Sequence, residues 1–349
     1  MIDVERENLE RLNIPIYGAI LAAGLGTRLR PLTVHTPKPL VPVLGRPLIE
    51  WSMIALAQAG VKSLGVNSYH LGDQLEERLD FGKITDEVNQ LNRSLQANLS
   101  LVKESELLGT GGGIKGIWSS LNITAANASM VCLNGDALFD FSLMPLLTEH
   151  NASTNQPQPT STLALRSVEP GDPFGRIGVD KAGRVVRIAE VTGPLSHTEV
   201  RVGAFTGAQV VTQAVIDRIP SGFCDIFRTA HRALLSEDLE IKAHFVDEHS
   251  LWVDVGNMER YLSAHQALLN RPKSPLWRYI PPHTRDRGAV IFKGGHLGDD
   301  IETADNVWIG ENASVTGTSS HLKDVVLWQK ALLSEDGPIK QRVVTPYVM

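Results

Sequence analysis

Between residues 16 and 147, short apolar runs of β type alternate with longer stretches at helical spacing, and this alternation restricts the fold more than any other feature. A strand, a crossover helix and a second strand form a parallel pair, so the pattern predicts βαβ units around a largely parallel sheet. Strands are expected at 16–21, 63–67, 99–103 and 130–133. Helices are expected at 47–59, 71–79 and 113–121, with Gly60 ending the first of them.

The rest of the chain predicts a second mixed half and a separate tail. Strands are expected at 162–168, 176–179 and 184–188, the last two forming a hairpin. The polar stretch 151–160 is expected to be a surface loop, and the Pro-rich, polar stretch 270–288 marks a domain boundary. We therefore expect an N-terminal extension at 1–13, a main domain at 14–270, a linker at 271–288 and a tail at 289–349.

Apolar residues of the tail recur at a period of six. One series consists of Ile291, Leu297, Ile309, Val315 and Leu327, with Thr303 and His321 in the remaining places, and a second consists of Ile301, Val307, Ala313 and Val325. Two registered series at this period are typical of a short left-handed parallel β-helix built from hexapeptides. Only about two or three coils fit, so we expect the tail to pack on the main domain or on another subunit, which makes a homo-oligomer a hypothesis.

Composition excludes several classes of function. The 349 residues include 33 Lys and Arg against 39 Asp and Glu, a net charge of −6, which excludes a basic nucleic-acid coat. No apolar run approaches the ~18 residues of a transmembrane helix, so we expect a soluble protein without a membrane partner. The first residues lack a secretory signal, and neither the two cysteines nor the 11 histidines have metal-binding spacing. We expect a cytoplasmic protein without disulfides or structural zinc.

The first strand runs into a Gly-rich, basic loop, and the string AILAAGLGTRLRPLTVHTPKP at 19–39 is the strongest functional signal. Gly24 and Gly26 allow backbone amides to approach phosphate oxygens, while Arg28, Arg30 and Lys38 can neutralise phosphate charge. The string contains no GxxxxGK[ST], and it lacks the third glycine of the dinucleotide fingerprint. The loop therefore predicts a polyphosphate-binding site that is neither a Walker loop nor a dinucleotide-binding loop.

The sequence resembles the sugar-1-phosphate nucleotidylyltransferase family, whose signature is a Gly-x-Gly-Thr-Arg loop followed by Pro-Lys-Pro. The resemblance covers roughly 15–270, because LGTGGGIK at 108–115, LNGDALFD at 133–140 and LWVDVGNMERYL at 251–262 follow the family's order. It implies a Rossmann-like nucleotidyltransferase domain with a mainly parallel mixed sheet, to which a short hexapeptide tail is often attached. It also implies an enzyme that joins a nucleoside triphosphate to a sugar-1-phosphate and releases pyrophosphate.

Two carboxylates are candidate magnesium ligands. Asp136 follows the strand 130–133 in an Asn-Gly-Asp turn, at the carboxyl edge of the sheet where ligands bind. Asp254 stands in the strand-like run Trp-Val-Asp-Val-Gly, where a charge is costly without a partner. By resemblance, these two carboxylates hold Mg²⁺ against the nucleotide α-phosphate. Arg28 and Lys38 complete the expected catalytic set, because the reaction needs charge neutralisation and in-line placement rather than a protein nucleophile.

The resemblance also implies binding residues for both substrates. The nucleotide is expected to contact Leu21, Ala22, Ala23, Gly24, Gly26, Thr27, Glu104, Gly109, Thr110 and Gly111. The sugar is expected to contact Asn134, Gly175 and Glu190. One departure concerns the sugar phosphate, because many relatives place Lys directly after the Glu that matches Glu190, whereas Val191 follows here. Either Arg176, Arg201 or Lys38 replaces that cation, or the sugar-phosphate side is altered.

Several hypotheses remain for the exact reaction. The string at 21–50 is most similar to family members that transfer uridylyl to N-acetylmuramic acid 1-phosphate, which makes an amino-sugar uridylyltransferase the first hypothesis. Guanylyltransferases acting on mannose- or heptose-1-phosphate are the alternatives. A non-catalytic regulatory subunit is a hypothesis of another class, against which the joint presence of Arg28, Lys38, Asp136 and Asp254 speaks. An NAD-dependent oxidoreductase would need an acidic residue about 20 positions after the glycines, and the stretch 40–45 contains none.

Overall fold

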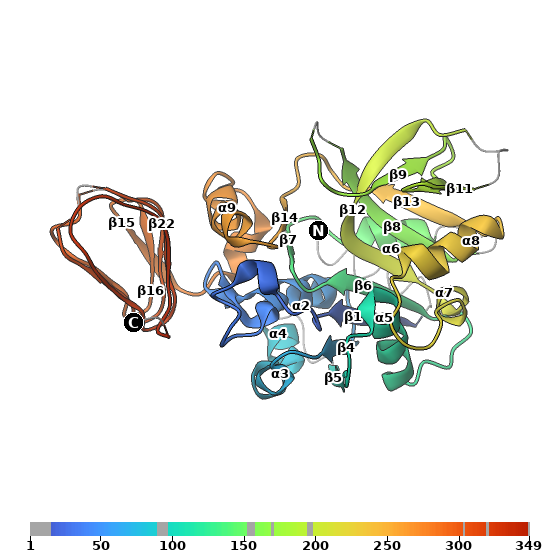
Figure 1. Ribbon diagram of the computed structural model, residues 1–349, viewed down its shortest axis with the longest axis horizontal. Coiled ribbons are helices and arrows are strands. Elements are labelled where there is room, and N and C mark those ends of the chain that lie inside the picture. The colour runs from blue at the N-terminus through green and yellow to red at the C-terminus, as the bar shows by residue number, and fades with distance from the viewer. Residues whose placement is uncertain are drawn as a thin grey trace. The chain divides into compact units, whose positions relative to one another are not determined.

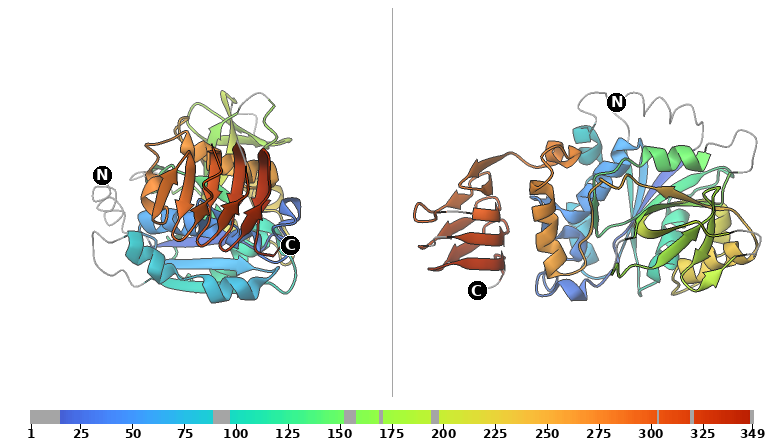
Figure 2. Two further views of the ribbon diagram at one scale, coloured as in Figure 1. Left: turned by 90° about the vertical axis from the view of Figure 1, so that its left-hand side faces the viewer. Right: turned by 90° about the horizontal axis from the view of Figure 1, so that it is seen from above.

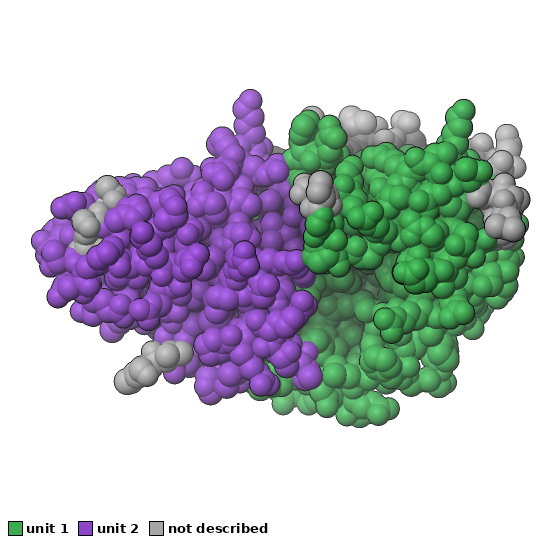
Figure 3. Space-filling view, turned by 45° about the horizontal axis from the view of Figure 1, so that its top comes forward, with its two compact units in different colours: residues 1–24, 49–137, 141–250 green, residues 25–48, 138–140, 251–349 purple. Residues whose placement is uncertain are grey.

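A computed structural model describes residues 15–88, 97–151, 158–168, 171–193, 198–302, 304–318 and 321–347. The predicted extension at 1–13, residues 152–157 of the predicted loop, and Thr303 lie outside these ranges. The chain divides into two compact units (Figure 3): unit 1 is Met1–Gly24, Ile49–Ala137 and Phe141–Ser250, and unit 2 is Leu25–Leu48, Leu138–Asp140 and Leu251–Met349. Because the units interleave along the sequence, the domain limits at 270 and 288 stay a prediction.

The four strands predicted in the first half form the parallel part of the sheet in unit 1. They are β1 (Ile16–Leu21), β4 (Ser63–Ser68), β5 (Asn98–Lys103) and β6 (Ser129–Asn134). β1 pairs in parallel with β4 and β6, and β4 pairs in parallel with β5 (Figure 1). Helical crossovers return the chain to the same edge of the sheet, which is why these strands are parallel. The predicted parallel sheet is confirmed for this half.

An antiparallel half extends the same sheet beyond β6. β12 (Arg201–Val211) runs antiparallel to β6, β8 (Ser161–Ser167) and β9 (Arg176–Val179), and its register with β8 shifts between Phe205 and Gln209. β9 and β10 (Val185–Ile188) form the predicted hairpin, β11 (Val191–Thr192) pairs with β10, and β13 (Ile241–Phe245) pairs in parallel with β8. Sequence patterning missed β12, because Gly203 and Gly207 interrupt its apolar residues. The sheet is therefore mixed.

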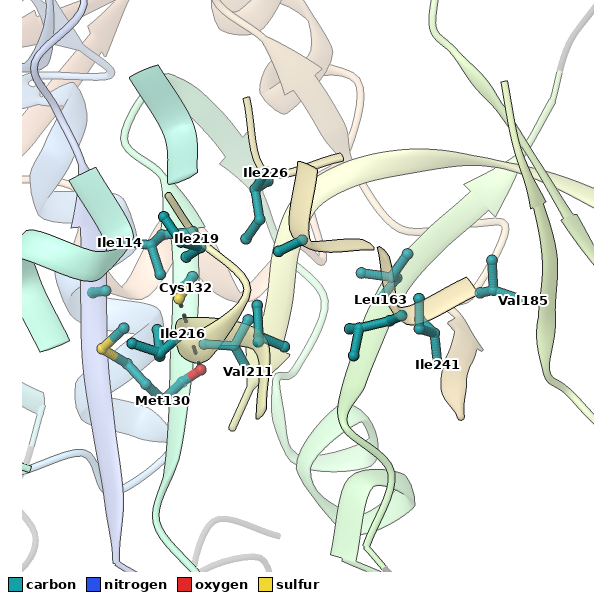
Figure 4. Packing of buried hydrophobic residues seen from close by; sticks show 14 of the residues in the cluster. Ile114, Met130, Cys132, Leu163, Val185, Val211, Ile216, Ile219, Ile226 and Ile241 are labelled. Carbon is teal, nitrogen blue, oxygen red and sulfur yellow. Dashed lines mark hydrogen bonds between the residues drawn. The ribbon is translucent and has the colours of Figure 1, made fainter. Parts of the chain in front are cut away.

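Helices accompany this sheet. They are α2 (Leu48–Gln58), α3 (Gly72–Arg78), α4 (Phe81–Val88), α5 (Gly109–Ser120), α6 (Met144–Asn151), α7 (Gln213–Asp217) and α8 (Arg232–Ser236), the last preceded by a π-helical turn, Phe227–His231. Buried side chains of β6, β8, β12, α5 and α7 form a continuous core, of which Figure 4 shows Ile114, Cys132, Val211 and Ile216. In the described part of the chain, no helix is long and apolar enough to cross a membrane.

Unit 2 contains most of the Gly-rich loop, a helix and the tail. Two 3₁₀ turns, Thr27–Leu29 and Lys38–Leu40, shape the loop, and the small hairpin of β2 (Pro42–Val43) and β3 (Arg46–Pro47) follows it. β7 (Ala137–Phe139) pairs with β14 (Trp252–Asp254), and α9 (Met258–Leu269) begins four residues after β14. Asn257 caps this helix, because its side-chain oxygen accepts from the Arg260 amide at 2.9 Å. A 3₁₀ turn, Pro275–Tyr279, leads to the tail.

The tail consists of parallel strands repeated at a nearly constant interval, preceded by β15, which runs antiparallel to β16. One sheet contains β15 (His283–Asp286), β16 (Ala289–Phe292), β18 (Ala304–Ile309), β20 (Leu322–Leu327) and β22 (Ile339–Val344), and another contains β17 (His296–Leu297), β19 (Ser314–Thr316) and β21 (Leu332–Ser334). Ile291 pairs with Ile309 and Ile309 with Leu327, so these strands repeat after 18 residues, or three hexapeptides, whereas Leu327 pairs with Val344, 17 residues later. Figure 2 shows these strands stacked on one another.

The repeat explains the period-six apolar series. All of the apolar residues predicted on the two series are buried in one core cluster, whereas His321 is only half-buried. Gly294, Asn312 and Lys330, again 18 residues apart, have φ of 69°, 55° and 62° and turn successive coils at the same corner. The left-handed backbone region recurs at this corner because each coil must bend there in the same way.

Candidate nucleotide-binding site

A buried polar network in unit 1 holds the backbone at the end of β1. The Asn67 side chain accepts from the Ala22 amide at 2.7 Å and donates to Glu104 Oε1 at 2.6 Å. Glu104 Oε2 accepts from the Leu108 amide at 3.0 Å. Glu104, which is predicted as a nucleotide contact, accepts a protein hydrogen bond at each of its oxygens and so links the segment after β1 to the segment before α5. Asn67 was not predicted, although a buried amide at the carboxyl end of a parallel strand was a usable signal.

The Gly-rich start of α5 packs against a second loop. The Cys224 amide donates to the Leu108 carbonyl at 2.8 Å, and the Gly111 amide donates to the Cys224 carbonyl at 2.9 Å. A Cβ on Gly109 would lie 2.6 Å from the Cys224 carbonyl oxygen, and one on Gly111 would collide with Cys224 Sγ. Close backbone packing thus requires both glycines. The predicted helix start at 113 was wrong, because α5 begins at Gly109. The glycines that suggested a turn are needed for close packing against the second loop.

The basic loop of unit 2 is compact. Gly26 has φ of 63°, and its carbonyl accepts from Thr33 Oγ1 at 2.8 Å and from the Leu29 amide at 3.0 Å. A Cβ on Gly26 would lie 3.0 Å from Lys38 Cβ, so the two ends of the loop touch at this glycine. Lys38 is buried at 8% exposure, while Arg28 is exposed. The loop therefore brings the Lys38 stem against the glycine that opens it.

Asp254, at the end of β14, is paired and partly covered. Arg260 Nη1, on the first turn of α9, donates to Asp254 Oδ2 at 2.6 Å, and the Asp254 side chain is 15% exposed. A Cβ on Gly256 would lie 2.8 Å from Asp254 Oδ2 and 3.3 Å from Arg28 Nη2. Arg28 and Asp254 therefore flank Gly256 in unit 2. Arg260 was not predicted, because only the fold turns the first residues of α9 back to the end of β14.

Asp136 lies in unit 1, in the turn after β6, as predicted. The Gly135 amide donates to the Leu21 carbonyl at 2.9 Å, and a Cβ on Gly135 would lie 2.9 Å from that oxygen. The turn is thus pressed against the end of β1, and Asp136 beside it is half-buried. Asn134 is half-buried against β12, where Gly207 has φ of 89° and a Cβ on it would lie 3.0 Å from Asn134 Cβ.

The predicted sugar contacts Gly175 and Glu190 are both exposed in unit 1. Asp172 holds the loop before Gly175: its Oδ2 forms an ion pair with Arg166 Nη1 at 2.6 Å, and its Oδ1 accepts from the Phe174 amide at 3.1 Å. Of the cations considered as substitutes for the missing lysine, Arg201 lies over the Phe245 ring at 3.4 Å from its centroid, and Arg176 is exposed. Which of Arg176, Arg201 and Lys38 replaces the missing lysine at the sugar phosphate therefore stays a prediction.

Comparison with known proteins decides the family. Residues 17–271 match the family described as nucleotidyl transferase, and this stretch is well over half of the chain. The chain belongs to the nucleotidyl transferase family. This confirms the resemblance to sugar-1-phosphate nucleotidylyltransferases. The protein is therefore an enzyme of the nucleotidyltransferase class.

Three relatives illustrate the range of this family. The mannose-1-phosphate guanylyltransferase of Mycobacterium tuberculosis is 30% identical over 320 residues, which are 90% of this chain and 80% of the relative. The UTP–glucose-1-phosphate uridylyltransferase of Synechocystis is 30% identical over 341 residues, 94% of this chain and 82% of the relative. The catalytic subunit beta of a mannose-1-phosphate guanylyltransferase from Xenopus tropicalis is 25% identical over 266 residues, 75% and 68% of the two chains. The relatives' names thus include two different nucleotide bases.

Three histidines of this family member are buried and neutral. Burial lowers the pKa of His150 and of His231 to about 3, and that of His265 to about 4. His150 bonds to Thr162 Oγ1 at 2.8 Å and His231 to Ser161 Oγ at 3.2 Å. All three lie in the core of the protein. None of the three has the proton affinity of a general base at neutral pH.

Proposed function

We propose that this protein transfers a nucleotidyl group from a nucleoside triphosphate to a sugar-1-phosphate and releases pyrophosphate. The observation that carries the proposal is the grouping in unit 2 of Arg28, Asp254 and the compact loop closed by Gly26 and Lys38. A cationic guanidinium and a carboxylate on either side of Gly256, next to a glycine-opened basic loop, suit a polyphosphate and its counter-ion. The family supports the same reaction class.

In the proposed reaction, an oxygen of the sugar phosphate attacks the α-phosphorus, and the bond from that phosphorus to the bridging oxygen of pyrophosphate breaks. The attacking phosphate is already ionised at neutral pH, so no protein base is required. Arg28 and Lys38 bind phosphate oxygens and neutralise charge as the two anions meet. Glu104 and Asn67 hold the backbone at Ala22 and Leu108 in place for the nucleotide, and positioning of this kind supplies much of the rate.

We propose Asp136 and Asp254 as the ligands of Mg²⁺. Among the residues described, no group of three or more His, Cys, Asp and Glu side chains forms a metal cage. The two carboxylates of Asp136 and Asp254 suit magnesium, which is commonly bound by one or two carboxylates together with substrate phosphates and water. Asp136 directly precedes β7, which pairs with β14, the strand that ends at Asp254. When bound, the ion would add positive charge at the α-phosphate.

The nucleotide is proposed to lie against the backbone of 21–24 and 108–111, with Gly26 and Thr27 at its phosphates. Asn134, Gly175 and Glu190 are the proposed sugar contacts, and Arg176, Arg201 or Lys38 would meet the sugar phosphate. Two subtypes compete: uridylyl transfer to an N-acetylmuramate-type 1-phosphate, and guanylyl transfer to mannose- or heptose-1-phosphate. Mannose-1-phosphate guanylyltransferases among the relatives support the second, and the Synechocystis relative supports a uridylyl donor.

The test is pyrophosphate release in the presence of magnesium, with UTP, GTP, dTTP, CTP and ATP each combined with N-acetylmuramic acid, mannose, glucose and heptose 1-phosphates. Release with one combination would establish the reaction and identify both substrates. Silence across the panel, together with nucleotide binding in a thermal-shift assay, would instead support a regulatory subunit, for which Val191 in place of the usual lysine is the favouring observation.

We further propose that the tail is a left-handed parallel β-helix and that it mediates self-association in a cytoplasmic protein. The 18-residue repeat and the recurring corner at Gly294, Asn312 and Lys330 support the β-helix. A short solenoid has open ends that a second copy can cover. Light scattering at several concentrations tests this, and a monomeric full-length chain throughout would exclude it.

A further inference from the structure

The hairpin that follows Lys38 is held by the tail and α9, all within unit 2. Its turn residues Leu44 and Gly45 have φ of 56° and 80°. A Cβ on Gly45 would lie 2.5 Å from Cζ of Phe292 on β16, so the tail packs directly on the turn. Arg46 Nε also donates to the Tyr279 carbonyl. Neither contact involves a residue of the proposed catalytic set.

Tyr261 on α9 joins the tail to this hairpin through its hydroxyl. Tyr261 Oη donates to the Pro42 carbonyl at 2.7 Å and accepts from the indole nitrogen of Trp328 at 3.0 Å. The directions are unambiguous, because a carbonyl only accepts and an indole N–H only donates. Tyr261 has no exposed surface, and burial raises the pKa of its hydroxyl, which therefore keeps its proton at neutral pH.

His265, one turn further along α9, makes a second connection. Its Nε2 accepts from the Leu44 amide at 3.2 Å, and its Nδ1 lies 2.9 Å from the Tyr261 carbonyl. The amide can only donate, so Nε2 carries no proton and Nδ1 is the donor. The opposite side of the connection is the tail, where the Trp308 ring lies edge-on to His265 with 5.3 Å between centroids. Tail, helix and hairpin thus form one hydrogen-bonded and aromatic assembly.

This assembly ends at the turn that carries Lys38. The Val41 amide donates to the Lys38 carbonyl at 3.1 Å, and Pro42, the acceptor for Tyr261, is the next residue. We propose that Tyr261 and Trp328 are positioning residues that hold the Lys38 turn in its binding conformation, so that the tail acts on phosphate binding through one hydroxyl. This inference rests on the proposed function, because it assigns Lys38 to phosphate binding.

The kinetic test uses the full-length chain and whichever substrate pair the panel identifies. Tyr261→Phe removes the hydroxyl and Trp328→Phe removes its donor, and both keep an aromatic ring in a buried place. We expect each to lower kcat/KM about fivefold to tenfold, and the double variant to be no worse than Tyr261→Phe, because both act through one oxygen. In a Lys38→Ala background, Tyr261→Phe should have little further effect. An equal additional loss there would overturn the inference, since a general structural effect would not depend on Lys38.

Trp277→Phe is the matched control. It removes a comparable indole hydrogen bond, from Trp277 Nε1 to the Arg271 carbonyl at 3.0 Å, that reaches neither Tyr261 nor the hairpin. We expect it to leave kcat/KM within twofold of the original chain. The Trp277 ring also stacks on Trp308, with 6.3 Å between centroids, so a loss equal to that of Trp328→Phe would assign the effect to this aromatic packing and overturn the assignment to the Tyr261 hydroxyl.

Amide hydrogen exchange separates this inference from the proposed function. The Leu44 and Val41 amides should exchange about tenfold faster in Tyr261→Phe and Trp328→Phe, and unchanged in Trp277→Phe, whether or not the protein turns over any substrate. A chain that is silent across the substrate panel but shows this exchange pattern would contradict the proposed function and keep the mechanical connection. An active chain with unchanged exchange and unchanged kcat/KM in both variants would contradict the inference alone.

Discussion

The buried histidines connect single side chains to the pH dependence of folding. An unfolded chain protonates a histidine near its ordinary pKa of 6.5, whereas burial lowers the pKa of His150 to about 3 and of His265 to about 4. Between these values the unfolded state binds more protons than the folded state. Their contribution to stability is therefore full above about pH 6.5 and is lost as the pH falls toward 4 for His265 and toward 3 for His150.

We expect the free energy of unfolding to decrease between pH 6.5 and pH 5 by on the order of 1 kcal/mol per pH unit for each buried histidine. Urea unfolding at pH 7, 6 and 5 measures the slope. His150→Gln should flatten it, whatever it does to stability at pH 7, while His296→Gln, at an exposed position, should not. A slope that is unchanged in His150→Gln would show that His150 titrates alike in both states.

Asp254→Asn and Asp136→Asn should each abolish magnesium-dependent turnover, with a loss of about 100-fold or more, because the ion and its charge are lost from the α-phosphate. Asparagine keeps an oxygen that Arg260 can bond at position 254, so the fold should survive. Pyrophosphate release is measured against magnesium concentration, with melting temperature as the check on folding. Full activity in either variant would exclude the shared metal site.

Lys38→Ala should lower kcat/KM by the equivalent of roughly 1.5–3 kcal/mol, because it removes a charge-assisted contact to phosphate. Lys83→Ala, which removes an exposed lysine of α4, is the control for the loss of one positive charge. Steady-state kinetics at fixed ionic strength gives both values. If the two variants behave alike, Lys38 does not bind substrate.

At the scale of secondary structure, the start of α5 illustrates how glycines serve packing. Gly111 faces Cys224 Sγ, and backbone hydrogen bonds between Leu108, Gly111 and Cys224 hold the helix start against that loop. Gly116, on the same helix, has room for a side chain, because a Cβ there would lie 3.6 Å from Val102 Cγ1. Gly111 and Gly116 therefore lie in the same helix but differ in how closely neighbouring atoms approach them.

We expect Gly111→Ala to destabilise the protein by about 1–3 kcal/mol through overpacking. Gly116→Ala should be neutral or slightly stabilising, since alanine favours a helix interior by up to about 1 kcal/mol. Cys224→Ala should restore part of the loss in Gly111→Ala, because it removes the sulfur that the new methyl meets. Urea unfolding of the original chain, Gly111→Ala, Cys224→Ala and the double variant gives the coupling energy, and additive effects would mean that Sγ is not the obstacle.

At the scale of the whole molecule, the tail is part of the core of unit 2. Phe292, Trp308 and Trp328 are buried, and they cover Gly45, His265 and Tyr261. A chain that ends at Asn270 would expose these surfaces and leave the Tyr261 hydroxyl without its indole donor. The tail therefore contributes to stability in addition to any role in self-association.

Truncation after Asn270 should lower the midpoint of thermal unfolding by about 5–10 °C, because several kcal/mol of burial are lost. Differential scanning calorimetry measures the midpoint, and light scattering on the same samples reports the mass. A truncated chain with an unchanged midpoint would contradict the contribution of the tail to unit 2. Loss of self-association on truncation is expected if the tail carries the interface.

Local pattern was sufficient wherever neighbours in sequence decide the structure. The parallel strands β1, β4, β5 and β6 follow from short apolar runs, and the repeated strands of the tail follow from the period of six, because both patterns record which residues along the chain are buried. The Gly-rich loop and the Asn-Gly-Asp turn were also predicted, since turn chemistry is local. From these motifs the sequence determined the family and the candidate residues.

Tertiary structure decided the contacts between residues distant in the chain. The bond from Asn67 to Glu104, the approach of Arg28 and Asp254 to Gly256, and the connection from Trp328 through Tyr261 to Pro42 join residues brought together only by folding. Glu104, which stays a predicted nucleotide contact, also supports the backbone, because its two oxygens accept from Asn67 and from the Leu108 amide. Periodicity records which side of an element is buried, but not which partner it meets, and the partners assign each polar group its role.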